Sequence, residues 1–110
     1  MPINRGEILL RIARASIAEA LSQPYEPIDD EIKNISWLQQ EAASFVTLTQ
    51  HGQLRGCIGT LQAHRPLLED VSSNARAAAF KDPRFSPLTA DELADTEIEV
   101  SLLSPMQDIQ

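Results

Sequence analysis

The residues best suited to chemistry lie in one short stretch, residues 54–61, with the sequence Leu-Arg-Gly-Cys-Ile-Gly-Thr-Leu. It contains Cys57, the only cysteine of the chain, and Arg55 two residues before it. A thiolate is a strong nucleophile, and a neighbouring cation favours the thiolate over the thiol. The stretch therefore predicts one candidate catalytic residue, Cys57.

A nucleophilic cysteine usually works with a general base within hydrogen-bond reach, and the two histidines are poorly placed for this role. His51 precedes the stretch and His64 follows it, and an extended strand between them is about 25 Å long at roughly 3.3 Å per residue. The same separation argues against a zinc site, because the spacing matches no Cys/His metal motif. Cys57 therefore also fits a structural role in a strand, and the sequence predicts no metal and no cofactor.

Binding, rather than catalysis, is predicted for a larger set of residues: Arg55, Gly56, Gly59, Arg65 and Arg84. Guanidinium groups recognise carboxylate or phosphate through two parallel hydrogen bonds, so the arginines predict a site for a small anionic ligand. The glycines would let a ligand or another backbone approach the strand, although they form neither a dinucleotide nor a phosphate-loop motif. Two structural alternatives stay open: the glycines relieve crowding beneath a helix, and Arg84 forms a salt bridge inside the domain.

Size, charge and cysteine content limit the classes of protein to which the chain can belong. Its 110 residues fit one small domain, and its net charge of −7 argues against nucleic-acid binding, which needs a basic surface. Residues 55–84 hold five bases against three acids and could still bind a small anion. The single cysteine, the lack of a signal-peptide pattern and the lack of an apolar run of about 20 residues predict a cytoplasmic protein outside the membrane.

Hydrophobic periodicity and turn signals predict helices packed on a largely antiparallel sheet, which is an α+β fold. The predicted helices cover residues 6–22, an ambiguous short segment within 29–38, 66–80 and 89–94, and the predicted strands cover 44–50, 54–61 and 96–104. Asn4, followed three residues later by Glu7, predicts the cap of the first helix. The alanines between 75 and 79 predict close packing of the third helix on the sheet.

The first two strands form a predicted hairpin, whose register decides what lies beside Cys57. A three-residue loop over 51–53 pairs Gln50 with Leu54. This register places Arg55 and Cys57 together on the more polar face, opposite Thr47. A two-residue loop would place Arg55 among the apolar residues of the first strand, which burial disfavours, so the sequence favours the longer loop.

At this spacing, residues 54–59 (Leu-Arg-Gly-Cys-Ile-Gly) and residues 82–85 (Asp-Pro-Arg-Phe) resemble the signature segments of the AMMECR-one domain family. Further similar segments are residues 65–67, 74–80, 87–88 and 99–106. The resemblance covers residues 45–106 or so, with weaker support from the first helix. The prokaryotic members of this family are similar to protein A of the AmmeMemoRadiSam system.

The resemblance implies an α+β domain with two lobes around a sheet, and it does not imply a settled reaction. It also implies a genomic association with a Memo-like protein and a radical S-adenosylmethionine protein. The domain of the family continues beyond the strand that ends at Ser104, whereas this chain stops at Gln110. Residues 1–110 are therefore expected to be a single AMMECR-one-like domain in its N-terminal portion only, with an incomplete sheet.

Two functional hypotheses follow. The first is an accessory domain that binds a ligand or partner through the polar face around Arg55 and Cys57 and acts with the Memo-like and radical proteins. The alternative is an enzyme that uses Cys57 as a nucleophile on a small anionic substrate, which Arg55 or Arg84 would orient. An unpaired edge on the strand over 96–104 would also predict a homodimer.

Overall fold

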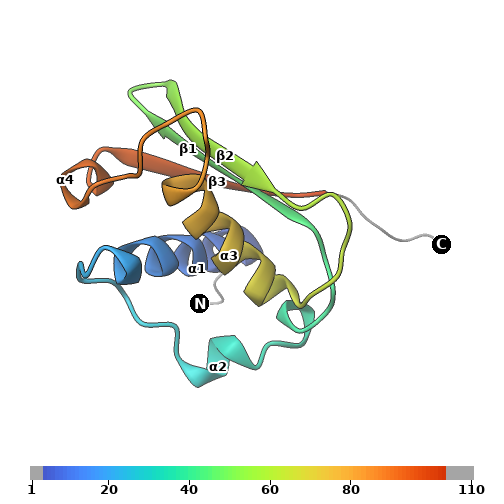
Figure 1. The fold of residues 1–110 in the computed structure, drawn as a ribbon. Coiled ribbons are helices and arrows are strands. Elements are labelled where there is room, and N and C mark those ends of the chain that lie inside the picture. The colour runs from blue at the N-terminus through green and yellow to red at the C-terminus, as the bar shows by residue number, and fades with distance from the viewer. Residues whose placement is uncertain (1–3, 104–110) are drawn as a thin grey trace.

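The computed structural model describes residues 4–103 and has the α+β fold that the sequence predicts (Figure 1). In chain order its elements are α1 (Arg5–Ala20), α2 (Asp30–Lys33), the 3₁₀ turn η1 (Ser36–Leu38), β1 (Ser44–Gln50), β2 (Gln53–Gly59), α3 (Leu67–Phe80), α4 (Ala90–Leu93) and β3 (Thr96–Leu102). These elements match the predicted ones, with small differences at their ends. Ser104, the predicted last residue of the final strand, lies outside the described residues.

Helix α1 begins where the sequence predicts because Asn4 caps it. The Asn4 side chain accepts a hydrogen bond from the backbone N–H of Glu7 at 2.8 Å, which satisfies a donor that the first turn of a helix leaves unpaired. The apolar residues of α1 recur at helical spacing, and Ile12 and Ile17 are buried in the core.

The connector between α1 and β1 contains the short segment that the sequence left ambiguous. Its residues form α2 followed by η1, and the Asp29 side chain caps α2 by accepting the backbone N–H of Ile32 at 3.0 Å. Leu38 at the end of η1 is fully buried. This side chain ties the connector to the core.

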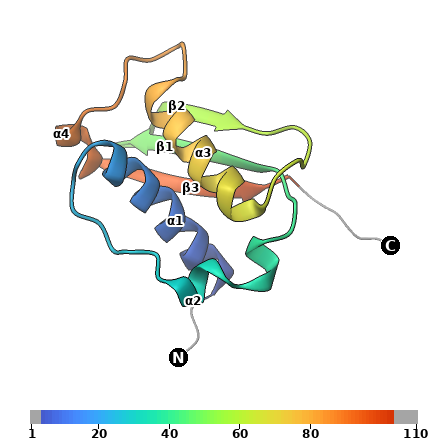
Figure 2. The same cartoon turned by 60° about the horizontal axis from the view of Figure 1, so that its bottom comes forward.

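The described strands form an antiparallel sheet in the order β2-β1-β3, with β1 in the centre. Figures 1 and 2 show α1 and α3 beside each other on one face of the sheet, while no described helix covers the other face. Val46 and Leu48 of β1 point to the helices and are fully buried. Thr47 lies between them in sequence, so strand alternation directs it to the uncovered face.

The hairpin closes through two residues, so the predicted three-residue loop is wrong. His51 and Gly52 form the turn with φ values of 53° and 81°, as the type I′ turn of a tight hairpin requires. A β-bulge then adds Arg55 to β2, and beyond it Thr47 pairs with Cys57 as the sequence predicts. The bulge supplies the extra residue that the longer loop was expected to supply.

Helix α3 approaches β2 closely because Gly56 has no side chain. A Cβ added at Gly56 would collide with the carbonyl oxygen of Ala78. Ala75 and Ala78 are also buried. The predicted packing of the alanine face of this helix on the sheet is therefore confirmed.

Candidate functional site

Cys57 lies in the middle of β2, half-buried and on the uncovered face of the sheet. Its Sγ is 3.2 Å from Oγ1 of Thr47 on β1, and its backbone N–H donates to Oδ2 of Asp82 at 3.0 Å. Among residues 4–103 the Thr47 hydroxyl is the hydrogen-bond partner of the thiol. Within the described residues, therefore, no imidazole or carboxylate base forms a hydrogen bond with the Cys57 thiol.

The turn that follows α3 places an ion pair close to Cys57. Arg84 donates from Nε and Nη2 to the two carboxylate oxygens of Asp82, at 3.0 and 2.7 Å. These bonds come first among the causes that hold the pKa of Asp82 well below its usual range, and Asp82 in turn raises the pKa of Arg84. The salt bridge that the sequence left open for Arg84 is present.

Arg55 is the bulged residue of β2, and its guanidinium pairs with Glu92 on α4. Nε and Nη2 donate to the two carboxylate oxygens at 2.9 and 3.0 Å, and Gln50 donates to the same carboxylate. Gln50 points to the same face of β1 as the buried core residues, so the Glu92 carboxylate that binds both Gln50 and Arg55 lies on the helix-covered side. Cys57, in contrast, lies on the uncovered face. The prediction that Arg55 and Cys57 share one polar face is therefore wrong, because a bulge interrupts the alternation of side chains along the strand.

The pair of Arg55 and Glu92 is half-buried, and the guanidinium of Arg55 lies over an aromatic ring. The hydrogen bonds from Arg55 are the main cause that lowers the pKa of Glu92 to about 2. The Phe85 ring centroid is 5.9 Å from the guanidinium of Arg55 and 5.4 Å from that of Arg84. Among the described residues, Nη1 of Arg55 is buried without a hydrogen-bond partner.

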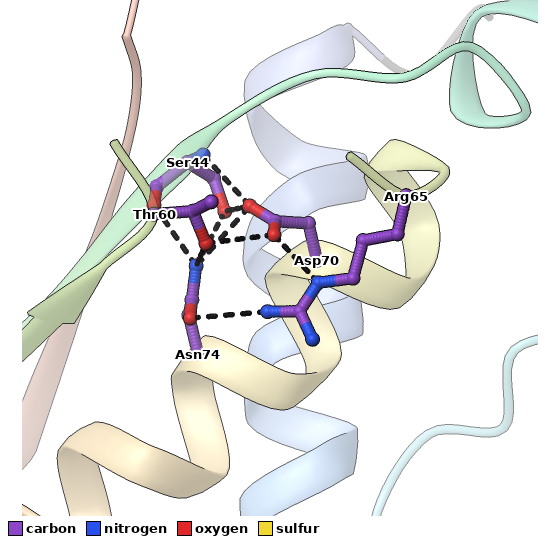
Figure 3. A network of polar contacts seen from close by, with 5 residues as sticks. All are labelled: Ser44, Thr60, Arg65, Asp70 and Asn74. Carbon is purple, nitrogen blue, oxygen red and sulfur yellow. Dashed lines mark hydrogen bonds and ion pairs between the residues drawn. The ribbon is translucent and has the colours of Figure 1, made fainter. Parts of the chain in front are cut away.

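Arg65 belongs to a buried polar network at the other end of β2 (Figure 3). Its Nε donates to Oδ1 of Asp70 at 2.7 Å, and the Thr60 hydroxyl donates to the same oxygen at 2.8 Å. The backbone N–H and hydroxyl of Ser44 donate to Oδ2 of Asp70 at 2.8 and 2.7 Å. Asn74 adds a bond to this oxygen at 3.1 Å. The network joins three parts of the chain: the start of β1, helix α3, and the segment that follows β2.

Asp70 is a charged group in the core. Burial alone would raise its pKa, but the hydrogen bonds from Ser44, Arg65 and Thr60 together lower it. Sequence reasoning missed this role of Asp70. A signal was present, because Asp70 and Asn74 are four residues apart at the spacing of the buried stripe of α3.

The candidate glycines both face protein atoms. Gly56 lies against the backbone of Ala78, and a Cβ at Gly59 would collide with the ring of Phe45. The space that a ligand would need beside either glycine is therefore occupied by the chain. The alternative that the sequence left open, relief of crowding beneath a helix, describes Gly56.

The three candidate arginines share one feature, which is a carboxylate partner from the chain itself. The pairs are Arg55–Glu92, Arg65–Asp70 and Arg84–Asp82. Glu92 is also a capping residue for α4. Since each guanidinium already neutralises a carboxylate, these arginines are less available to an anionic ligand than the sequence predicts.

The histidines do not join this region. His51 is exposed at the hairpin turn and His64 is exposed in the segment after β2. Within residues 4–103, no group of three or more His, Cys, Asp and Glu side chains is arranged to hold a metal ion. In the same range, no helix has both the length and the apolar character that a membrane crossing requires.

The sheet, the helix pair on one face and the ion-paired hairpin define a small α+β domain. The chain belongs to the AMMECR1 (AMMECR-one) family, whose family model matches residues 10–110. A protein of Saccharolobus islandicus is 40% identical over 109 residues, which is 96% of this chain and 47% of the relative. A protein of Methanothermobacter thermautotrophicus is 37% identical over 112 residues, which is 99% of this chain and 57% of the relative.

A solved structure supports the same fold. The crystal structure of the uncharacterized protein PH0010 from Pyrococcus horikoshii matches with a TM-score of 0.78 and 36% sequence identity. The match covers 91% of this chain and 51% of that chain. The chain therefore spans about half the length of the relatives that it matches.

Proposed function

We propose that this chain is an accessory domain of the AMMECR1 family that binds a partner and does not itself catalyse a reaction. It would act in the cytoplasm with a Memo-like protein and a radical S-adenosylmethionine protein. One observation supports this proposal above the others: the chemically reactive groups are paired within the chain. The candidate arginines are neutralised by the chain's own acids, and the Cys57 thiol contacts a hydroxyl rather than a base. The residues best suited to catalysis or ligand binding thus contribute contacts within the hairpin, α3 and α4.

We assign the partner to the uncovered face of the sheet. Thr47 pairs with Cys57 on one side and with Glu99 on the other, so these side chains form one polar row across the strands. Glu97 and Glu99 are exposed. A partner with a basic surface would complement this face, since charge complementarity favours both encounter and specificity.

Titration calorimetry with a purified Memo-like protein from the same organism tests the assignment. Replacing both acids of this face, Glu97→Lys with Glu99→Lys, is expected to weaken binding about tenfold or more. The matched control is Glu31→Lys with Glu69→Lys, which reverses two exposed acids on the helices and should leave affinity unchanged. If the unmodified chain does not bind, or if both double variants bind alike, the proposal is wrong.

A homodimer through the edge of β3 is a second proposal about partners. Within residues 4–103, β3 pairs only with β1, and Leu102 and Leu103 at its end are 50% and 45% exposed. An unpaired edge can bind another strand. Sedimentation equilibrium at rising concentration should then show a dimer, and a monomer at every concentration would exclude it.

One observation favours the alternative of an enzyme that uses Cys57 on a small anionic substrate. The carboxylate of Asp82 accepts hydrogen bonds from both Arg84 and the backbone N–H of Cys57, so the guanidinium of Arg84 lies near Cys57 and would orient an anionic substrate. Iodoacetate, an anion, should then alkylate Cys57 faster than neutral iodoacetamide, and Arg84→Met should remove the preference. Reaction no faster than that of a small free thiol, or only after unfolding, would exclude this alternative.

A further inference from the structure

A cavity of about 370 Å³ lies between α1, α3 and the connector that carries α2. This volume falls in the range of small-molecule sites, roughly 300–1,000 Å³. The connector passes on the side of the helices away from the sheet, so the cavity is remote from Cys57 and the hairpin (Figure 1). The residues that determine its chemistry are Ile12, Ser16, Tyr25, Ile28, Leu68 and Arg76.

Arg76 is the polar centre of this cavity. Its Nη1 donates to the hydroxyl of Ser16 on α1 at 2.6 Å. The Ser16 hydroxyl is buried and donates in turn to the backbone carbonyl of Ser72 at 2.8 Å. Because the Ser16 proton is committed to Ser72, its lone pairs face Arg76 and hold the guanidinium in place.

The charge of Arg76 is not neutralised within the described part of the chain. The ion pairs of residues 4–103 involve Arg11, Arg55, Arg65 and Arg84. Arg76 is exposed and Ser16 is a neutral acceptor, so Nε and Nη2 of Arg76 are left to bind a ligand. This is the pattern of a binding arginine, since a guanidinium recognises an oxyanion through two parallel bonds.

The remaining walls add one more cation and several apolar side chains. Lys33 and Glu19 also line the cavity, so its net charge is positive in a chain whose net charge is −7. Ile28, Leu68 and the half-exposed ring of Tyr25 supply apolar contact. The combination suits a ligand with an anionic group and an apolar body.

We propose that this cavity binds a small organic oxyanion, either a carboxylate or a phosphate monoester, through Arg76. Ser16 acts as the positioning residue that holds the guanidinium at the cavity wall. The apolar part of the ligand lies against Ile28, Leu68 and Tyr25. The site is separate from the partner surface on the sheet, so it does not depend on the function proposed above.

Titration of the full chain, followed by amide chemical shifts in NMR, tests this site with three probes. Phenyl phosphate and phenylacetate supply the two oxyanions on one ring, and benzyl alcohol supplies the ring without the charge. At least one anion should shift residues of 12–19, 25–28 and 68–76, and bind about tenfold or more tightly than the alcohol. Which anion binds more tightly decides between phosphate and carboxylate. Shifts elsewhere, equal binding of the alcohol, or no shift at millimolar concentration would overturn the proposal.

Three variants assign the binding to Arg76. Arg76→Met keeps the length of the side chain and should weaken anion binding about tenfold or more, whereas Lys81→Met, an exposed cation at the end of the same helix, should not change it. Glu19→Gln removes the acid of the cavity and should strengthen anion binding several-fold. The amide spectra confirm that each variant is folded. Unchanged binding by Arg76→Met or Glu19→Gln would overturn the proposal.

Discussion

The two ends of β2 are both held by arginine–carboxylate pairs, but the carboxylates of these pairs differ in burial. At the Thr60 end, Asp70 is fully buried and its partner Arg65 is 24% exposed. At the bulged end, Glu92 is 31% exposed beside Arg55. Solvent screens the pair of Arg55 and Glu92, which we call the outer pair. The carboxylate of Asp70, at the centre of what we call the inner network, depends wholly on protein donors.

Because of this difference, we expect similar contacts to contribute unequally to stability. Asp70 receives donors from β1, from the segment after β2 and from its own helix, so its loss would leave several buried donors unpaired. Glu92 joins α4 to the hairpin at the surface. We therefore expect the inner network to hold the fold together and the outer pair to order a local segment.

The largest expected effect is that of Asp70→Asn, which replaces an acceptor with an amide donor that faces other donors. We expect a loss of about 3–5 kcal/mol in the free energy of unfolding, because a buried charged network loses its centre. Urea titration followed by circular dichroism measures it. Glu69→Gln, which removes an exposed acid in the same helical turn, should change stability by less than about 0.5 kcal/mol. Similar effects of the two variants would remove the distinction between the ends of β2.

A smaller loss of free energy of unfolding is expected from Gly56→Ala, at a position between the two ion-paired ends of β2. The added methyl group must displace the backbone at Ala78, and such overpacking typically costs about 1–3 kcal/mol. The same urea titration measures this effect, and Gly52→Asn at the exposed turn is the control, since asparagine tolerates positive φ. A neutral Gly56→Ala would show that α3 can move away from β2 without loss.

Acid should destabilise the bulged end. The pKa of Glu92 is lowered from 4.5 to about 2 in the folded chain, so its ionised form stabilises the fold above pH 4.5 and this contribution is lost as the pH falls towards 2. After allowance for solvent screening, we expect a loss of about 1–2 kcal/mol from this residue. Glu92→Gln should remove that part of the pH dependence in denaturant titrations between these limits, and an unchanged profile would contradict the assignment.

The smallest effect is the coupling between Arg55 and Glu92. A double-mutant cycle with Arg55→Met and Glu92→Gln should give a coupling energy of about 1 kcal/mol, as partly exposed pairs do. The matching cycle with Arg65→Met and Asp70→Asn should give a larger value. A larger coupling at the bulged end would reverse the comparison.

The sequence was sufficient to predict most of the fold, because local signals specify each element. The Asn4 cap, the alternation of β1 and the alanines of α3 all predicted what the structure contains. The candidate site was less predictable. Cys57 contacts Thr47 as expected, but the sequence did not reveal that Asp70 and Asn74 of α3 organise the inner network.

By itself, the sequence therefore determined the helices, the strands, the family and the residues suited to catalysis or binding. Only the tertiary structure decided which partner each of those residues meets. Glu92 is 37 residues from Arg55 in the chain, and Ser16 is 60 residues from Arg76. Helical and strand periodicity act over a few residues, whereas these pairs depend on how whole elements pack. A single bulged residue sufficed to place Arg55 beside Glu92 and not beside Cys57.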